Sequence, residues 1–322
     1  MTKLSTYHPA VTRIIENINK VIIGKEEPII LSLTALLAGG HVLLEDVPGV
    51  GKTMLVRSLA RSVDCDFKRI QFTPDLLPSD VTGVSIYNPK TLEFEFRPGP
   101  ILGNIVLADE INRTSPKTQS SLLEAMEEKN ITVEGNALPL ADPFFVMATQ
   151  NPVDYEGTYP LPEAQLDRFL LKIQMGYPNA AEELRMLASV GENHPITRVE
   201  PVMTKNELVQ MQKDVTNVYM DQQIQQYIVN LAQASRKHPD VYLGLSPRGS
   251  IALVRAAKAY AYIHYRDYVI PDDVQTLAPY VIGHRVLLRS EARYDGLTSE
   301  KLIQRLLAAV EVPVEKESVH ER

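Results

Sequence analysis

The 322-residue sequence contains a single cysteine, Cys65. One cysteine can form neither an internal disulfide nor a cysteine-based metal centre, which is typical of proteins from reducing compartments. The seven histidines are scattered without the spacing of metal ligands, so we expect neither a zinc site nor histidine catalysis. No apolar run approaches the roughly 18 residues of a membrane-spanning helix, and the amino terminus has no apolar signal core. We therefore expect a cytoplasmic protein with no direct membrane insertion.

Positive charge is also in short supply. Lys and Arg number 33 against 40 Asp and Glu, which gives a formal net charge of −7. A broad, sequence-independent nucleic-acid surface needs clustered cations, so the composition argues against one, although it is compatible with a local basic pore. Hydrophobic residues make up 44% of the chain, which is enough for a sizeable core. The length suits two domains of roughly 150 residues each.

The segment from His41 to Thr53, HVLLEDVPGVGKT, is the central motif. A short apolar run predicts a buried strand, a loop with glycines follows, and helical periodicity begins at Lys52. This context is typical of a phosphate-binding loop, in which backbone N–H groups and a helix N-terminus bind an anion. The pattern G-x-x-x-x-G-K-[ST] is complete except at its first glycine, which is Asp46 here. The residues predicted to surround the phosphates are Asp46, Val47, Pro48, Gly49, Val50, Gly51, Lys52, Thr53 and Met54.

Within this loop, Lys52 would contact the β- and γ-phosphates of a nucleotide, and the Thr53 hydroxyl would bind Mg2+. A second motif, IVLADE at 105–110, is an apolar run that ends in two acids. Such a strand places carboxylates at the carboxyl edge of a parallel sheet, where ligands bind. Asp109 would hold the Mg2+, mostly through water, and Glu110 would activate the water that attacks the γ-phosphate. Because no guanine-specifying Asn-Lys-x-Asp run occurs, ATP is favoured over GTP.

Two positions near these motifs have two interpretations each. The VIIGKE segment precedes the phosphate loop, so Ile23 and Gly24 either contact the adenine base or serve ordinary packing between helices. Asn151 follows the strand predicted at 144–148. Its amide either holds the attacking water or the γ-phosphate, or it forms a capping turn ahead of Pro152.

Two arginines have equally open roles. Arg168 lies in a predicted helical turn, where it is either an ion-pair partner of Asp167 or Glu163, or an arginine finger directed at a neighbouring subunit's γ-phosphate. Arg248 opens a long predicted helix, where the helix dipole disfavours a cation. It either binds a phosphate between the domains or is a plain surface arginine.

The remaining pattern predicts an α/β domain over 1–178 and a small all-helical domain over 179–322. Two alternating runs between Thr73 and Pro100 predict a β-hairpin inserted in a helical segment, with a plain loop as the alternative. Residues 130–140 predict a second hairpin. Composition shifts at 177–179, beyond which the periodicity is helical, and Thr204 and Glu207 form a capping box.

Five segments closely resemble the MoxR family of AAA+ ATPases, and the resemblance covers nearly the whole chain. It implies an α/β fold with an AAA+ P-loop core, β-hairpin inserts and a helical lid. The inserts would face the centre of a ring and touch a client, and Asp46 at the first glycine position is usual for the family. The segments are GVGKT (49–53), LADEINRTSPKTQSSLLEAMEE (107–128), ATQNP (148–152), EGTYPLPEAQLDRF (156–169) and LSPRGSIAL (245–253).

The resemblance also implies a role for each candidate residue. It assigns the Walker A pair to Lys52 and Thr53, the Walker B acids to Asp109 and Glu110, sensor 1 to Asn151, the arginine finger to Arg168 and sensor 2 to Arg248.

The function implied by this resemblance is Mg2+-dependent ATP hydrolysis by a homo-oligomer, commonly a hexameric ring with sites shared between subunits. Family members act as chaperone-like factors that mature or activate client enzyme complexes, including metal-cofactor insertion, often with a von Willebrand A domain protein. Two alternatives remain: a DNA-acting motor of the same clade, and a nucleotide-gated scaffold with little turnover. The negative charge argues against the first, and the intact Glu110 argues against the second.

Overall fold

The computed structural model describes residues 7–133, 135–151, 158–188 and 195–313. The chain divides into two compact units, Met1–Val215 and Thr216–Arg322. This division lies beyond the expected boundary at 178/179, because the segments after that point are hydrogen-bonded to the α/β unit. The N–H groups of Val202 and Met203 donate to the Ser62 carbonyl at 3.0 and 3.1 Å. Gln212 Nε2 donates to the Leu36 carbonyl at 2.7 Å.

The first unit is built on a five-stranded sheet with the strand order β2-β5-β8-β1-β9. Every pairing in it is parallel, so all five strands end at the same edge. The register pairs Gln71 with Asp109 and Glu45 with Gln150, which keeps these carboxyl ends level. The strands are β1 (Val42–Glu45), β2 (Phe67–Gln71), β5 (Ile105–Asp109), β8 (Phe145–Gln150) and β9 (Leu171–Ile173).

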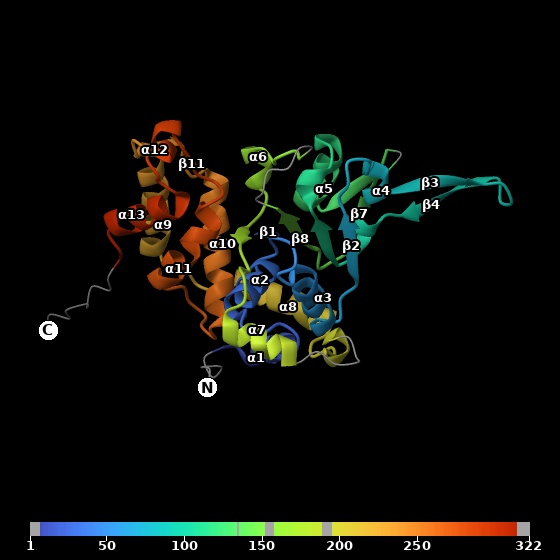
Figure 1. Cartoon of the computed structure of the whole chain (residues 1–322), viewed down its shortest axis with the longest axis horizontal. Coiled ribbons are helices and arrows are strands. Elements are labelled where there is room, and N and C mark those ends of the chain that lie inside the picture. Colours follow the sequence, from blue (N-terminus) through green and yellow to red (C-terminus); the bar gives the residue numbers. More distant parts are fainter. Residues whose placement is uncertain (1–6, 134, 152–157, 189–194, 314–322) are drawn as a thin grey trace. The chain divides into compact units, whose positions relative to one another are not determined.

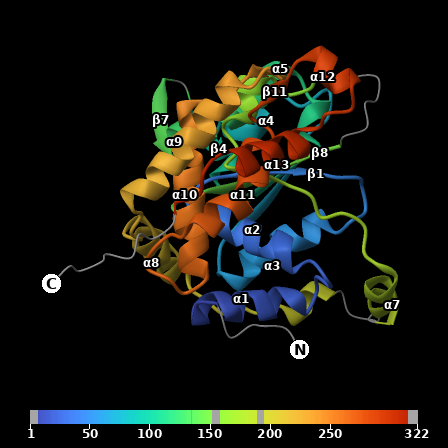
Figure 2. The ribbon, with the colours of Figure 1, turned by 90° about the vertical axis from the view of Figure 1, so that its left-hand side faces the viewer.

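Helices cover both faces of this sheet (Figure 1, Figure 2). On one face lie α2 (Glu26–Leu37) and α3 (Lys52–Ser62), with α1 (Pro9–Asn19) packed against them. On the other lie α4 (Pro78–Thr82) and α5 (Pro116–Glu128).

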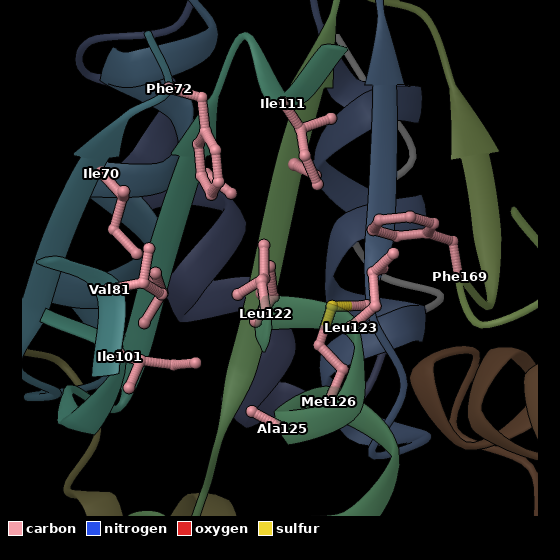
Figure 3. Close-up of a cluster of buried hydrophobic side chains, with 14 of the residues drawn as sticks. Ile70, Phe72, Val81, Ile101, Ile111, Leu122, Leu123, Ala125, Met126 and Phe169 are labelled. Carbon is pink, nitrogen blue, oxygen red and sulfur yellow. The ribbon is translucent and has the colours of Figure 1, made fainter. Parts of the chain in front are cut away.

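Strand β5 shows how the sheet and helices share one core. Val106 and Ala108 of β5 belong to a buried cluster with Leu122 and Met126 of α5 (Figure 3). The first four residues of β5 are all buried. A strand buried on both faces has no polar side to show, which explains why IVLA is continuously apolar.

Two β-hairpins are inserted in this unit, as predicted. The first pairs β3 (Gly83–Asn88) with β4 (Glu93–Pro98), and it projects away from the helices of its unit (Figure 1). Its far end exposes Leu92 and Phe94, at 72% and 69% of their surface. The second pairs β6 (Asn130–Val133) with β7 (Asn136–Pro139); residue 134 lies outside the described residues.

The rest of the first unit contains short elements. Hydrogen bonds at the start of α8 (Lys205–Thr216) confirm the predicted capping box: Thr204 N–H donates to Glu207 Oε2 at 2.7 Å, and Glu207 N–H donates to Thr204 Oγ1 at 3.3 Å. The elements are α6 (Glu163–Leu166), α7 (Ala180–Ala188), α8 (Lys205–Thr216) and the 3-10 turns η2 (Pro100–Leu102), η3 (Ile111–Arg113) and η4 (Pro195–Arg198).

The second unit is helical, as expected, and also contains one small antiparallel sheet that the sequence pattern does not predict. Its strands, β10 (Val241–Leu243) and β11 (Leu287–Leu288), are too short to show an alternating pattern. The helices are α9 (Gln222–Lys237), α10 (Pro247–Ile263), α11 (Pro271–Ile282), α12 (Ser290–Tyr294) and α13 (Ser299–Ala309). Across the parts of the chain that the structure describes, no helix combines the length and apolar character needed to cross a membrane.

A buried histidine joins β1 to its neighbours. His41 Nδ1 accepts a hydrogen bond from the Val146 N–H at 3.0 Å, and His41 Nε2 lies 3.2 Å from the Met126 carbonyl oxygen. Because Nδ1 accepts, Nε2 carries the hydrogen and the ring is neutral. The ring therefore has a structural role, in keeping with the absence of metal-ligand spacing.

We predict that His41→Leu lowers the free energy of unfolding by about 2–3 kcal/mol, because two buried backbone groups lose their partner. Urea denaturation followed by circular dichroism measures this loss. A loss below about 0.5 kcal/mol would show that the two hydrogen bonds contribute little net stability.

Candidate functional site

Side chains from the carboxyl ends of the strands surround one polar cavity of about 390 Å³. Lys52 and Thr53 line it from the first turn of α3, Asp109 from the last residue of β5, Glu110 from the position after it, and Asn151 from the position after β8. These residues are far apart in the sequence and meet because parallel strands end at one edge. The other lining residues are Pro48, Gly49, Gly51, Met54, Arg69 and Gln71.

The loop after β1 turns on two glycines in the left-handed region. Gly49 has a φ of +88° and Gly51 a φ of +94°, which residues with a Cβ rarely adopt. Gly51 is the N-cap of α3. The first N–H groups of α3 have no partner within the helix and form a site for an anion at its N-terminus.

Lys52 extends across this loop. Its Nζ donates to the Asp46 carbonyl oxygen at 2.7 Å. Burial lowers the pKa of Lys52, and the nearby carboxylates of Asp109, Asp46 and Glu110 oppose that shift. The ammonium group is thus held among acids, where a bound polyphosphate would meet it.

Asp46 has a role that the motif did not predict. Its carboxylate is buried and accepts three backbone N–H groups: Oδ1 from Val47 at 2.8 Å, and Oδ2 from Met175 at 2.7 Å and Gly176 at 2.6 Å. The side chain therefore ties the phosphate loop to the segment after β9. The Asp46 carboxylate thus binds protein backbone, and a contact of Asp46 or Val47 with phosphate remains a prediction.

Thr149 fixes both acids of β5 and was also missed. Glu110 has a φ of +58°, an uncommon conformation for a non-glycine residue that recurs at functional sites. Its N–H donates to Thr149 Oγ1 at 2.8 Å, and the Thr149 hydroxyl donates to Asp109 Oδ1 at 2.6 Å. A hydroxyl at the end of the otherwise apolar β8 was the available sequence signal.

Two side chains of β2 reach the same acids. Arg69 pairs with Asp109, with Nη2 2.6 Å from Oδ2, and Gln71 Nε2 donates to Glu110 Oε2 at 2.9 Å. Sequence reasoning did not single out either one. Their signal was two polar residues at alternate positions near the end of a strand, which places both on one face of the sheet.

A second, mainly apolar cavity of about 560 Å³ adjoins the polar one and shares four lining residues with it, Pro48, Gly49, Gly51 and Met54. Ile23, for which adenine contact and helix packing were both open, lines it together with Met175 and Tyr177. Gly24 is needed for another reason: its φ is +74°, and a Cβ there would lie 2.1 Å from the Glu182 side chain. An apolar cavity suits the base of a nucleotide, and the adjoining polar cavity at the N-terminus of α3 suits its phosphates.

Oxygen ligands for a metal are available in the polar cavity from the Thr53 hydroxyl and the Asp109 carboxylate. Among the described residues, no group of three or more His, Cys, Asp or Glu could hold a metal ion. Two protein oxygens fit Mg2+, which usually keeps water and substrate phosphate oxygens as its other ligands.

The two candidate arginines belong to different units. Arg168 Nε is 2.9 Å from Glu127 Oε2 of α5, an acid that the sequence analysis did not consider as its partner. Arg168 lines neither cavity. Arg248 belongs to the second unit, in the first turn of α10, and its contact with a phosphate remains a prediction.

We predict that Asp46→Gly, although it completes the glycine pattern, weakens nucleotide binding by tenfold or more. The substitution removes a charged acceptor from three backbone N–H groups, and hydrogen bonds to charged groups are each worth about 1.5–3 kcal/mol. Titration with a fluorescent ADP analogue measures affinity, and the thermal midpoint should fall in parallel. Asp46→Asn, which keeps one acceptor oxygen, should lie between the two. An Asp46→Gly protein that binds as tightly as wild type would contradict this role.

Comparison with known proteins agrees with this geometry. Residues 41–171 match the ATPase family associated with various cellular activities (AAA), and residues 233–306 match the AAA lid domain. The chain is 64% identical to the uncharacterised protein YeaC of Bacillus subtilis, over 97% of this chain and 98% of that protein. It is 41% identical to Chaperone MoxR1 of Mycobacterium tuberculosis, over 94% and 82%. The crystal structure of a candidate ATPase from Cytophaga hutchinsonii matches with a TM-score of 0.90 and 39% identity, over 97% of each chain. The chain therefore belongs to the MoxR family of AAA+ ATPases.

Proposed function

We propose that this ATPase is a chaperone-like remodelling factor that uses ATP hydrolysis to mature or activate client protein complexes, including by metal-cofactor insertion. A relative that carries the name chaperone supports the general role. The observation that carries the mechanism is the meeting of Lys52, Thr53, Asp109 and Glu110 around one cavity.

In this proposal each residue has one task. The N–H groups at the start of α3 and the Lys52 ammonium bind the phosphates, and the adenine occupies the apolar cavity beside Ile23. Thr53 and Asp109 would hold Mg2+, which when bound neutralises charge on the phosphates. Glu110 accepts a proton from the attacking water, and Asn151 orients that water.

We assign Arg168 as an arginine finger that completes the site of a neighbouring subunit, and Arg248 as the sensor 2 arginine of the lid. Arg168 lines neither cavity of its own chain and is partly exposed, at 28% of its side chain. A cation supplied in trans stabilises charge in the transition state. Sites of this kind require an assembly, which we propose is a hexameric ring.

The proposed partners are a client enzyme complex and a von Willebrand A domain protein, in the cytoplasm. The exposed Leu92 and Phe94 of the β3–β4 hairpin provide apolar contact area for a client, since aromatic and large apolar side chains dominate such interfaces. The net charge of −7 gives no support to nucleic acid as the partner.

Mixing two inactive variants tests the shared site. Arg168→Ala subunits keep Glu110 but lack the finger, whereas Glu110→Gln subunits keep the finger but lack the base. We predict that each alone is inactive and that an equal mixture recovers about a quarter of wild-type phosphate release per subunit, as random neighbours in a ring would give. The measurement is steady-state phosphate release, with particle mass determined in parallel.

The matched control is Arg61→Ala, which removes an exposed arginine at the end of α3 and should remain active without a partner. If mixed assemblies form and no activity returns, or if Arg168→Ala alone hydrolyses ATP as fast as wild type, the shared-site assignment is wrong.

A further inference from the structure

Arg69 and Gln71 link the two acids of the polar cavity into one chain of hydrogen bonds. Arg69 Nη2 and Nε donate to Asp109 Oδ2 at 2.6 and 3.2 Å. Arg69 Nη2 also donates to Gln71 Oε1 at 2.6 Å, and Gln71 Nε2 donates to Glu110 Oε2 at 2.9 Å. Glu110 Oε2 further accepts from Arg113 Nη1 at 2.9 Å.

Chemistry allows only one orientation for the amide in the middle of this chain. A guanidinium group can only donate and an ionised carboxylate can only accept. The amide oxygen of Gln71 must therefore face Arg69, and its nitrogen must face Glu110. If Arg69 moves away, Gln71 loses one of the two contacts that hold its amide toward Glu110.

Each oxygen of the Asp109 carboxylate has a hydrogen-bond partner in this arrangement. Oδ1 accepts from the Thr149 hydroxyl at 2.6 Å, and Oδ2 is occupied by Arg69. The neutral Thr149 hydroxyl can stay on Asp109 when a cation binds there. The Arg69 guanidinium is positively charged, so it repels a cation that approaches the same carboxylate. Arg69 has room to move, because 48% of its side chain is exposed against 13% for Asp109.

We propose that Arg69 is a positioning residue that competes with the divalent cation for Asp109. While Arg69 donates to Oδ2 its positive charge opposes a cation at Asp109, and its departure also loosens Gln71 from Glu110. The two acids would then become available together, when nucleotide and metal bind. This inference rests on the proposed assignment of Mg2+ to Thr53 and Asp109.

The test is the Mg2+ dependence of binding of a fluorescent non-hydrolysable ATP analogue, measured at equilibrium so that hydrolysis plays no part. Arg69→Gln should lower the Mg2+ concentration for half-maximal binding by about two- to fivefold, the effect expected from losing a half-exposed competing ion pair. Arg69→Lys keeps the charge and should lie closer to wild type.

Lys68→Gln is the matched control. Lys68 precedes Arg69 on β2 and points to the opposite face of the sheet, where its Nζ lies 3.3 Å from Asp66 Oδ2. The substitution removes the same charge from the same strand and should leave the Mg2+ requirement unchanged. Arg69→Met, which keeps the aliphatic stem, repeats the test if glutamine lowers the thermal midpoint.

An Arg69→Gln protein whose Mg2+ requirement equals or exceeds that of wild type would overturn the competition. Wild-type binding that does not respond to Mg2+ at all would instead overturn the metal assignment on which the inference rests. If Lys68→Gln changes the Mg2+ requirement by the same amount, the effect comes from the net charge of the protein and not from the contact of Arg69 with Asp109. That result would also overturn the role of Arg69.

Discussion

The parallel direction of all five strands is the constraint on which the site depends. Every strand ends at one edge. The topology of the sheet therefore brings together the loop after β1, the acids at the end of β5 and the amide after β8. Because β5 is buried on both faces, the packed strand fixes the position of Asp109 and Glu110 at its carboxyl end. The polar residues that end β5 and β8 therefore bring charged and amide groups to the cavity.

A layer of supporting hydrogen bonds holds these functional groups in place. Asp46 ties the phosphate loop to the backbone after β9, and Thr149 connects the backbone of Glu110 to the carboxylate of Asp109. These contacts use charged or buried partners, for which unmade hydrogen bonds are costly. The Asp46 contacts hold the loop in shape, which lowers the entropic cost of ordering it when phosphate binds.

Much of this could be predicted from the sequence, because local patterns carried it. The apolar run before Asp109, the glycines before Lys52 and the alternating runs of the β3–β4 hairpin each specify one element. The short β9 and the β10–β11 pair have too few residues for a pattern. The roles of Arg69 and Gln71 depend on the register that pairs Gln71 with Asp109. That register is a property of the tertiary structure and cannot be read from either strand alone. The boundary between the units lies after residue 215 rather than at 178/179 for a similar reason. Hydrogen bonds such as that from Gln212 to Leu36 leave no local signal in the sequence.

In the proposed mechanism Glu110 activates the attacking water but is not required for ATP to bind in the cavity. The most direct test compares ATP affinity and single-turnover hydrolysis in wild type and Glu110→Gln. We predict similar affinity and at least a 100-fold slower chemical step in the variant, the usual contribution of a general base. Equal hydrolysis rates in the two proteins would contradict it. If both rates were fast, another group would be the base; if both were negligible, the chain would be a nucleotide-gated scaffold.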